Sequence, residues 1–156
     1  MTYYVGSCRN YFFNRMPRTG ALLSLSREHH SSLVMARAAR KAADDKDSTA
    51  CSTMIARIEA HWHTVLAAHF EQEEQLIRLA AEALDPESVV RVLAEHAELR
   101  MLACGPCMLE PIVRLRRFGD LLAAHVRYEE RVFFPQLQSH PCIASAATFN
   151  PINSER

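Results

Sequence analysis

Two stretches of the sequence carry the same pattern of one histidine and two glutamates. Residues 66–74 read LAAHFEQEE, and residues 122–130 read LAAHVRYEE. In a helix, residues four apart lie one above the other on one face, as the histidine and the first glutamate do in each stretch. Imidazole nitrogen and carboxylate oxygen together suit iron, manganese or zinc. The repeated pattern therefore predicts that each stretch supplies two ligands to a metal site.

Two further histidines lie at matching places in the two halves of the chain. His30-Ser-Ser-Leu33 resembles His96-Ala-Glu-Leu99, and each of these segments precedes one His-x-x-x-Glu stretch. The chain is therefore interpreted as an internal duplication, with one histidine and then one His-x-x-x-Glu pair in each half. His29 competes with His30 for the first position, and we favour His30 because it preserves the His-x-x-Leu match.

Helical periodicity places six of these side chains on apolar helix faces. The six are His30, His69, Glu73, His96, His125 and Glu129. His30, for example, shares its stripe with Leu23, Leu33 and Val34. A buried carboxylate costs on the order of several kcal/mol, so two of them in one core need compensation.

Metal ions are the compensation that this donor set favours. Six ligands are too many for one zinc ion, which takes about four, so two metals that share bridging carboxylates fit better. The alternative is a metal-free network in which the glutamates are protonated or pair with buried imidazolium. A ferritin-like site, which needs Glu-x-x-His on two helices, is excluded because no glutamate lies three residues before any of the eight histidines.

The elements that carry these residues are predicted to be helices, because apolar residues recur at intervals of three and four. We expect helices over residues 21–43, from the aspartate-rich turn at 44–47 to residue 84, over 86–104, and from 111 past 134. Short connections between four such helices predict an all-α, up-down four-helix bundle over residues 20–138. Residues 1–19 are expected to form an N-terminal arm, and residues 139–156 a flexible C-terminal tail.

Composition limits the classes of function. The 156 residues are 49% apolar, which suits one domain with a real core, and 18 basic residues balance 18 acidic ones. A chain without basic excess is a poor candidate for binding nucleic acid or an anionic membrane. No apolar run approaches the roughly 18 residues of a membrane span, and residues 1–20 lack the apolar core of a secretory signal. Five scattered cysteines do not suggest a disulfide framework, so we expect a cytoplasmic protein.

The pattern resembles that of the hemerythrin family, the HHE cation-binding domain. The resemblance covers about residues 22–137, and the glutamate pair followed by Phe133-Phe134-Pro135 is typical of the family. It implies a four-helix bundle that holds two non-haem iron ions, bridged by carboxylate or oxo groups, with zinc or manganese as substitutes. The implied ligands are His30, His69, Glu73, His96, His125 and Glu129. The implied function is reversible binding or sensing of oxygen or a related small ligand, such as nitric oxide or peroxide.

The chain departs from the oxygen-carrying members at two positions. Arg100 replaces a further histidine, and Glu129 lies four residues after the last histidine where those members have an aspartate at five. His29, Arg100 and Tyr128 are therefore candidates for an additional ligand or for contacts to the ligands. A ligand-binding protein, as monomer or homodimer, is favoured over two alternatives: a di-iron enzyme acting on peroxide or nitric oxide, and an iron-level sensor.

One further motif has a chemistry of its own. Cys104-Gly-Pro-Cys107 spells the thioredoxin tetrapeptide, but it follows a predicted helix, and no βαβ pattern surrounds it. We expect a turn that ends the third helix. The alternative is a reversible disulfide that senses the redox state.

Overall fold

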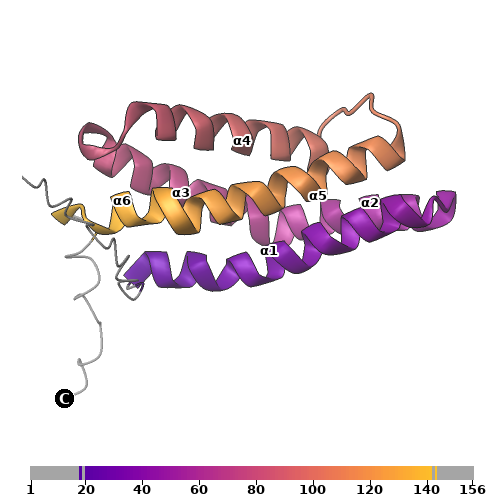
Figure 1. Cartoon of the computed structure of the whole chain (residues 1–156), viewed down its shortest axis with the longest axis horizontal. Coiled ribbons are helices and arrows are strands. Elements are labelled where there is room, and N and C mark those ends of the chain that lie inside the picture. The colour runs from indigo at the N-terminus through magenta and orange to yellow at the C-terminus, as the bar shows by residue number, and fades with distance from the viewer. Residues whose placement is uncertain (1–17, 19, 142, 144–156) are drawn as a thin grey trace, which may run out of the picture.

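The computed structural model describes residue 18, residues 20–141 and residue 143, and every regular element in this part is helical (Figure 1). The first helical segment is α1 (Gly20–Asp45), and the third is α4 (Pro86–Cys104). The second comprises α2 (Ser48–His61), the π-helical η1 (Trp62–Leu66), α3 (Ala67–Ala80) and the 3-10 turn η2 (Ala81–Ala83). The fourth comprises α5 (Pro111–Tyr128), the π-helical η3 (Glu129–Phe133) and α6 (Phe134–Gln138). The all-helical prediction is therefore confirmed for the described residues.

Local sequence signals explain where these helices begin. The Asp47 carboxylate caps α2 by accepting the Ala50 N–H at 2.6 Å, and Asp85 caps α4 by accepting the Ser88 N–H at 2.9 Å. Pro86 and Pro111 occupy the first turn of their helices, where a missing N–H costs nothing. The predicted breaks at the aspartate-rich turn and at residues 85–86 are thus confirmed.

Two apolar clusters form the core. One holds Phe70, Leu99 and Leu122, and the other holds Leu25, Ile77 and Phe133. Along α1, α4 and the η1–α3 and α5–η3 segments, each predicted ligand lies between a residue of one cluster and a residue of the other. The fold therefore encloses the predicted metal-binding region with apolar side chains on both sides.

Small residues bring α1 and α5 close together, and the two helices lie side by side in Figure 1. A Cβ atom on Gly119 would lie only 2.7 Å from the Ala36 carbonyl oxygen. Ala36, Ala39 and Ala43 are fully buried on the facing side of α1. The buried face of α1 is thus built largely from alanines rather than from large apolar residues.

The two π-helical turns are features that helical periodicity does not predict. In η3 the Phe134 N–H donates to the Glu129 carbonyl, one residue further back than in an α-helix. Pro135 follows directly, and its ring would clash with the carbonyl four residues earlier in a regular helix. The disturbance expected at this proline therefore takes the form of a wide turn that starts at Glu129, and the chain then continues as α6.

The predicted N-terminal arm, except Arg18, and most of the C-terminal tail lie outside the described residues. Ile143, which was assigned to the tail, is buried in the second apolar cluster, so the core extends beyond residue 138. Within the part of the chain that the structure describes, no helix is long and apolar enough to cross a membrane.

Candidate metal centre

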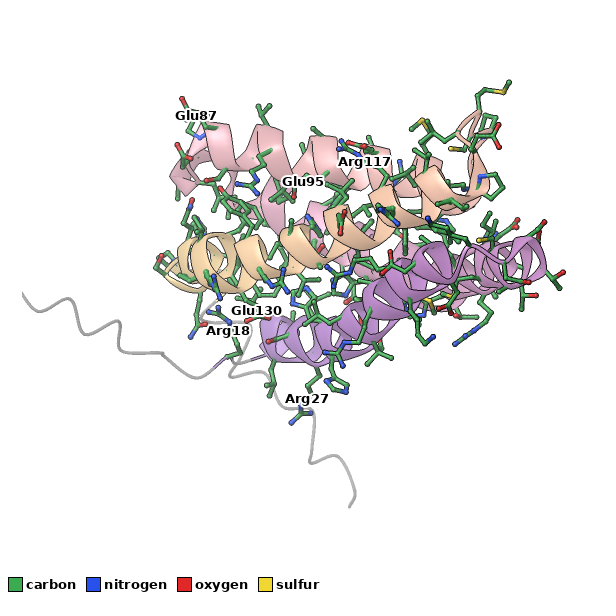
Figure 2. The ribbon with its side chains drawn as sticks, turned by 45° about the vertical axis from the view of Figure 1, so that its right-hand side comes forward. Arg18, Arg27, Glu87, Glu95, Arg117 and Glu130 are labelled. Atoms are coloured by element: carbon green, nitrogen blue, oxygen red, sulfur yellow. The ribbon has the colours of Figure 1, made fainter. Side chains whose placement is uncertain are left out.

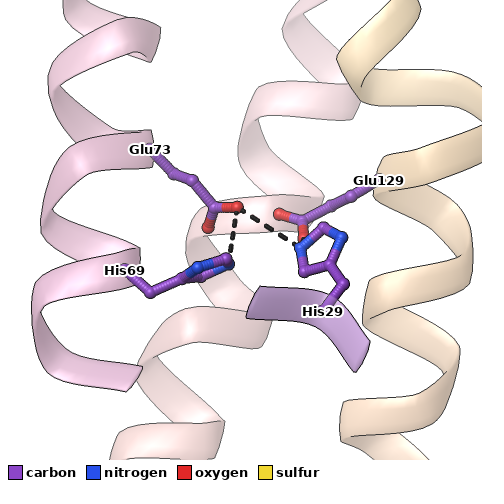
Figure 3. A group of neighbouring side chains, drawn as sticks. All are labelled: His29, His69, Glu73 and Glu129. Atoms are coloured by element: carbon purple, nitrogen blue, oxygen red, sulfur yellow. Dashed lines mark ion pairs between the residues drawn. The ribbon is translucent and has the colours of Figure 1, made fainter. Parts of the chain in front are cut away.

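Six buried side chains from four helical segments converge at the centre of the molecule, and Figure 3 shows four of them pointing toward one another. None of the six is more than 3% exposed. They are His29 from α1, His69 and Glu73 from α3, His96 from α4, His125 from α5, and Glu129 at the start of η3. Five of the six predicted ligands are therefore brought together, and His29 takes the position that was predicted for His30.

The preference for His30 is wrong in this fold, because His30 is exposed and His29 points inward. The buried face of α1 follows intervals of three and four through Leu22, Leu25, His29, Ser32, Ala36, Ala39 and Ala43. The stripe expected around His30 instead contains Val34, which is 54% exposed. The repeated Glu-His dipeptide at Glu28-His29 and Glu95-His96 is the sequence signal that identifies His29 correctly.

These two neighbouring histidines give a matched test of the site. His29→Ala should remove bound metal from the group that contains His69, because it deletes a buried nitrogen donor. His30→Ala should keep the parent's metal content and change the free energy of unfolding by no more than about 0.5 kcal/mol, as is usual at exposed positions. Elemental analysis and urea denaturation of both variants measure these effects. Loss of metal in the His30 variant instead would restore the original assignment.

The six side chains form two groups that can each hold a metal ion. In the first group, His69 Nε2 lies 3.0 Å from Glu73 Oε1, and His29 Nε2 lies 3.2 Å from Glu129 Oε2. In the second, His96 Nε2 lies 3.2 Å from Glu73 Oε2, and His125 Nε2 lies 3.1 Å from Glu129 Oε1. Within each group the four donor atoms lie within 4.8 Å of one another.

Both glutamates belong to both groups. Glu73 and Glu129 each direct one carboxylate oxygen toward the first group and the other oxygen toward the second. Both histidines of the first group come from the first half of the sequence, and both of the second group come from the second half. The two groups therefore correspond to the two repeats, and each carboxylate offers one oxygen to either group.

Each of the four histidines also contacts a second carboxylate through Nδ1. The Nδ1–oxygen distances are 2.7 Å for His29–Glu130, 2.7 Å for His69–Glu28, 3.2 Å for His96–Glu74 and 2.8 Å for His125–Glu95. An ionised carboxylate can only accept, so Nδ1 carries the proton, and a neutral ring then presents the Nε2 lone pair to the centre. Helical geometry puts Glu74 and Glu130 roughly 140° from His69 and His125, which predicts solvent exposure. The structure contradicts this prediction, because both side chains are half-buried against other histidine rings.

Seven polar atoms at the centre have no hydrogen-bond partner among the described residues. Nε2 of His29, His96 and His125 and all four oxygens of Glu73 and Glu129 are buried without a hydrogen-bond partner among the described residues. They lie 3.1–3.7 Å from one another as ion pairs. Each buried unsatisfied group costs about 1–3 kcal/mol. Because metal coordination would satisfy all of these atoms at once, the donor set fits a metal centre.

Without metal, the cluster is held by attraction between imidazolium and carboxylate. Burial lowers the pKa of His29, but the surrounding carboxylates, Glu129 first, outweigh it and raise this pKa to about 11. Burial likewise lowers the pKa of His125, and Glu129 raises it to about 10. For Glu129, burial raises the pKa, but the nearby imidazoles bring it well below its ordinary value. Two histidines are therefore protonated at neutral pH in the metal-free protein.

This protonation predicts opposite pH dependences with and without metal. His29 and His125 have folded-state pKa values above the ordinary 6.5, so their stabilisation is complete below pH 6.5 and is lost as the pH rises toward their folded pKa values. The free energy of unfolding of the metal-free protein should therefore fall from about pH 7 to 9, by up to about 1.4 kcal/mol per pH unit for each imidazole. With metal bound, these rings are neutral, and the free energy should instead rise up to about pH 7 and then level off.

Urea denaturation at several pH values, with either chelator or excess metal, measures both slopes. A metal-free protein that becomes more stable between about pH 7 and 9 would contradict the protonation of these histidines.

Aromatic rings cover the histidines. Phe70 stacks on His96 with ring centroids 4.0 Å apart, and Phe134 stacks on His29 at 5.1 Å. Phe70 also meets Trp62 edge to face at 5.7 Å. Phe70 and Phe134 are fully buried, so apolar surfaces pack directly against the candidate ligands.

The remaining predicted residues do not join the six. Arg100 is exposed and lies 3.9 Å from the Glu74 carboxylate, so it contacts the partner of His96 rather than the centre. The Tyr128 hydroxyl donates to Ser88 Oγ at 2.8 Å, and Tyr128 belongs to neither group. Cys104 and Cys107 are both half-buried free thiols, and Cys104 is the last residue of α4. The predicted helix-ending turn is present at this motif, whereas its redox role stays a prediction.

Comparisons of the chain with protein-family models, with curated proteins and with solved structures found no match. A functional assignment therefore depends on the chemistry of the six converging residues and of the carboxylates around them.

Proposed function

We propose that this chain is a non-haem di-iron protein that reversibly binds or senses oxygen or a related small ligand, such as nitric oxide or peroxide. The observation that carries the proposal is the sharing of Glu73 and Glu129 between two histidine-containing groups. Each glutamate directs one carboxylate oxygen toward each group, and this is the arrangement expected of carboxylates that bridge two adjacent metal ions. The proposed scaffold is an up-down four-helix bundle of the hemerythrin type, which the chain resembles in its repeated His-x-x-x-Glu-Glu pattern.

The donor set supports iron among the available metals. Each group offers two imidazole nitrogens and two carboxylate oxygens, a mixture that also suits zinc and manganese. Non-haem iron commonly combines histidine and carboxylate ligands with open coordination positions. Four protein donors leave such positions on each ion, and iron supplies the redox chemistry through which oxygen and related ligands bind.

The surroundings of the site support a small ligand. The six donors are at most 3% exposed, and Phe70 and Phe134 pack against them, so bulky or strongly hydrated molecules are disfavoured. The imidazoles are also fully engaged, because each Nδ1 is bonded to an outer carboxylate while Nε2 faces the centre. No ring among these four is free to move protons to a substrate, which favours reversible binding over turnover.

Ligand binding can be tested with the iron-loaded, chemically reduced chain in the absence of air. Addition of oxygen should change the absorption spectrum, and removal of oxygen under vacuum or argon should restore the starting spectrum. Nitric oxide and hydrogen peroxide are tested in the same way. Continuous, saturable consumption of peroxide or nitric oxide would favour the enzyme alternative, and an unchanged spectrum with all three would contradict ligand binding.

A further inference from the structure

The four outer carboxylates follow a regular rule in the structure. Each lies next in sequence to one of the six central residues, yet its carboxylate bonds a histidine of a different helical segment. Glu28 of α1 bonds His69 of α3, Glu74 of α3 bonds His96 of α4, Glu95 of α4 bonds His125 of α5, and Glu130 of η3 bonds His29 of α1. The fourth contact returns to the first helix, so the contacts close into a ring around the centre.

The ring follows the internal duplication. The Glu28–His69 contact lies within the first repeat, and Glu95–His125 is its counterpart within the second. The other two contacts, Glu74–His96 and Glu130–His29, each join one repeat to the other. Ion pairs formed by chance at the surface would not be expected to occur at matching positions of both repeats.

Burial and further contacts distinguish these pairs from ordinary surface salt bridges. The side chains of the histidines are 1–3% exposed, whereas those of the glutamates are 15–39% exposed, so each pair spans the boundary between centre and surface. Arginines hold three of the four carboxylates from outside: Arg18 lies 3.5 Å from Glu130, Arg91 lies 2.9 Å from Glu95, and Arg100 lies 3.9 Å from Glu74. Figure 2 shows Arg18 beside Glu130.

We infer that Glu28, Glu74, Glu95 and Glu130 are positioning residues that keep all four imidazoles as Nδ1–H tautomers with Nε2 directed at the metals. Because each carboxylate acts on the next helical segment, the ligand geometry of one helix depends on a residue of its neighbour. Outer partners of this kind orient a metal-binding histidine and raise its basicity. The inference rests on the metal centre of the proposed function, but not on iron or on the identity of the small ligand.

Glu95 gives the sharpest test, because Glu87 provides a matched exposed control on α4 and both are labelled in Figure 2. The probe is Zn²⁺ alone, with affinity measured on the full chain by competition with a chelating dye. Glu95→Ala should weaken zinc binding by about 10- to 100-fold, and Glu87→Gln should leave it unchanged. Glu95→Gln, whose amide oxygen still accepts the Nδ1–H, should recover part of the loss.

Histidine ¹H–¹⁵N spectra of the zinc-loaded protein separate a positioning role from a merely structural one. A merely structural role of Glu95 would not change the Nδ1–H signal of one particular histidine. The parent should show four Nδ1–H signals protected from exchange with water. In Glu95→Ala, the signal of His125 should lose this protection, whereas that of His96, the sequence neighbour of Glu95, should keep it. Parent-like affinity and spectra in the variant would overturn the ring, and a parent chain that binds no zinc would contradict the metal centre itself.

Discussion

Glu73→Gln is expected to weaken the binding of both metal ions. Glu73 directs Oε1 toward His69 in one group and Oε2 toward His96 in the other, so it serves both groups. An amide has a single oxygen acceptor and no charge, and its NH₂ group would face one of the two ions. The variant therefore loses an oxygen donor from one ion and, for both ions, the negative charge that offsets them.

The comparison with a histidine variant makes this prediction specific. His125→Ala removes a donor from the second group only, so the ion held by His29 and His69 should be retained more strongly than the other. Glu71→Gln, at an exposed position of the same helix α3, is the control and should keep the parent's metal content. Metals per chain are measured by elemental analysis after dialysis. If Glu73→Gln retained the parent's metal content, the bridging role would be wrong.

Removing the metal should lower the stability of the fold by several kcal/mol. The buried Nε2 atoms and the Glu73 and Glu129 oxygens lose their partners when the ions leave. A ligand that binds only the folded state stabilises it by about 4 kcal/mol for each site when its free concentration is a thousand times the dissociation constant. Urea denaturation near neutral pH, with metal or with chelator, measures the difference.

The control for this second prediction is a chain that has lost ligands from both groups. The double variant His69→Ala, His125→Ala should show no difference between metal and chelator, because each group then lacks a histidine. Equal free energies of unfolding for the parent in the two conditions would mean that the central atoms are satisfied without metal.

The sequence predicted which side chains converge where one continuous helical segment contains the whole pattern. The pairs His69–Glu73 and His125–Glu129 lie four apart on single helices, so periodicity alone puts both members on one face. The first helix was harder, because the His-x-x-Leu match between the two halves favoured His30, whereas the buried face of α1 passes through His29 and continues with small residues such as Ala36. The Glu-His dipeptide, repeated in both halves, resolves the choice.

The outer carboxylates could not be found from patterns within one helix. Glu74 lies roughly 140° from His69 on an ideal helix, which suggests a solvated side chain. Its partner is instead His96 on the adjacent α4, and only the packing of α3 against α4 brings the two together. The π-helical turn at Glu129 is likewise a result of how the chain accommodates Pro135, and no hydrophobic period marks it.

Metal content and visible spectrum, measured on protein purified from iron-supplemented cells, decide whether this chain holds a di-iron centre. We expect close to two irons per chain and ferric charge-transfer bands that disappear on reduction and return in air. A chain without metal, or with a single colourless zinc ion, would contradict the di-iron centre.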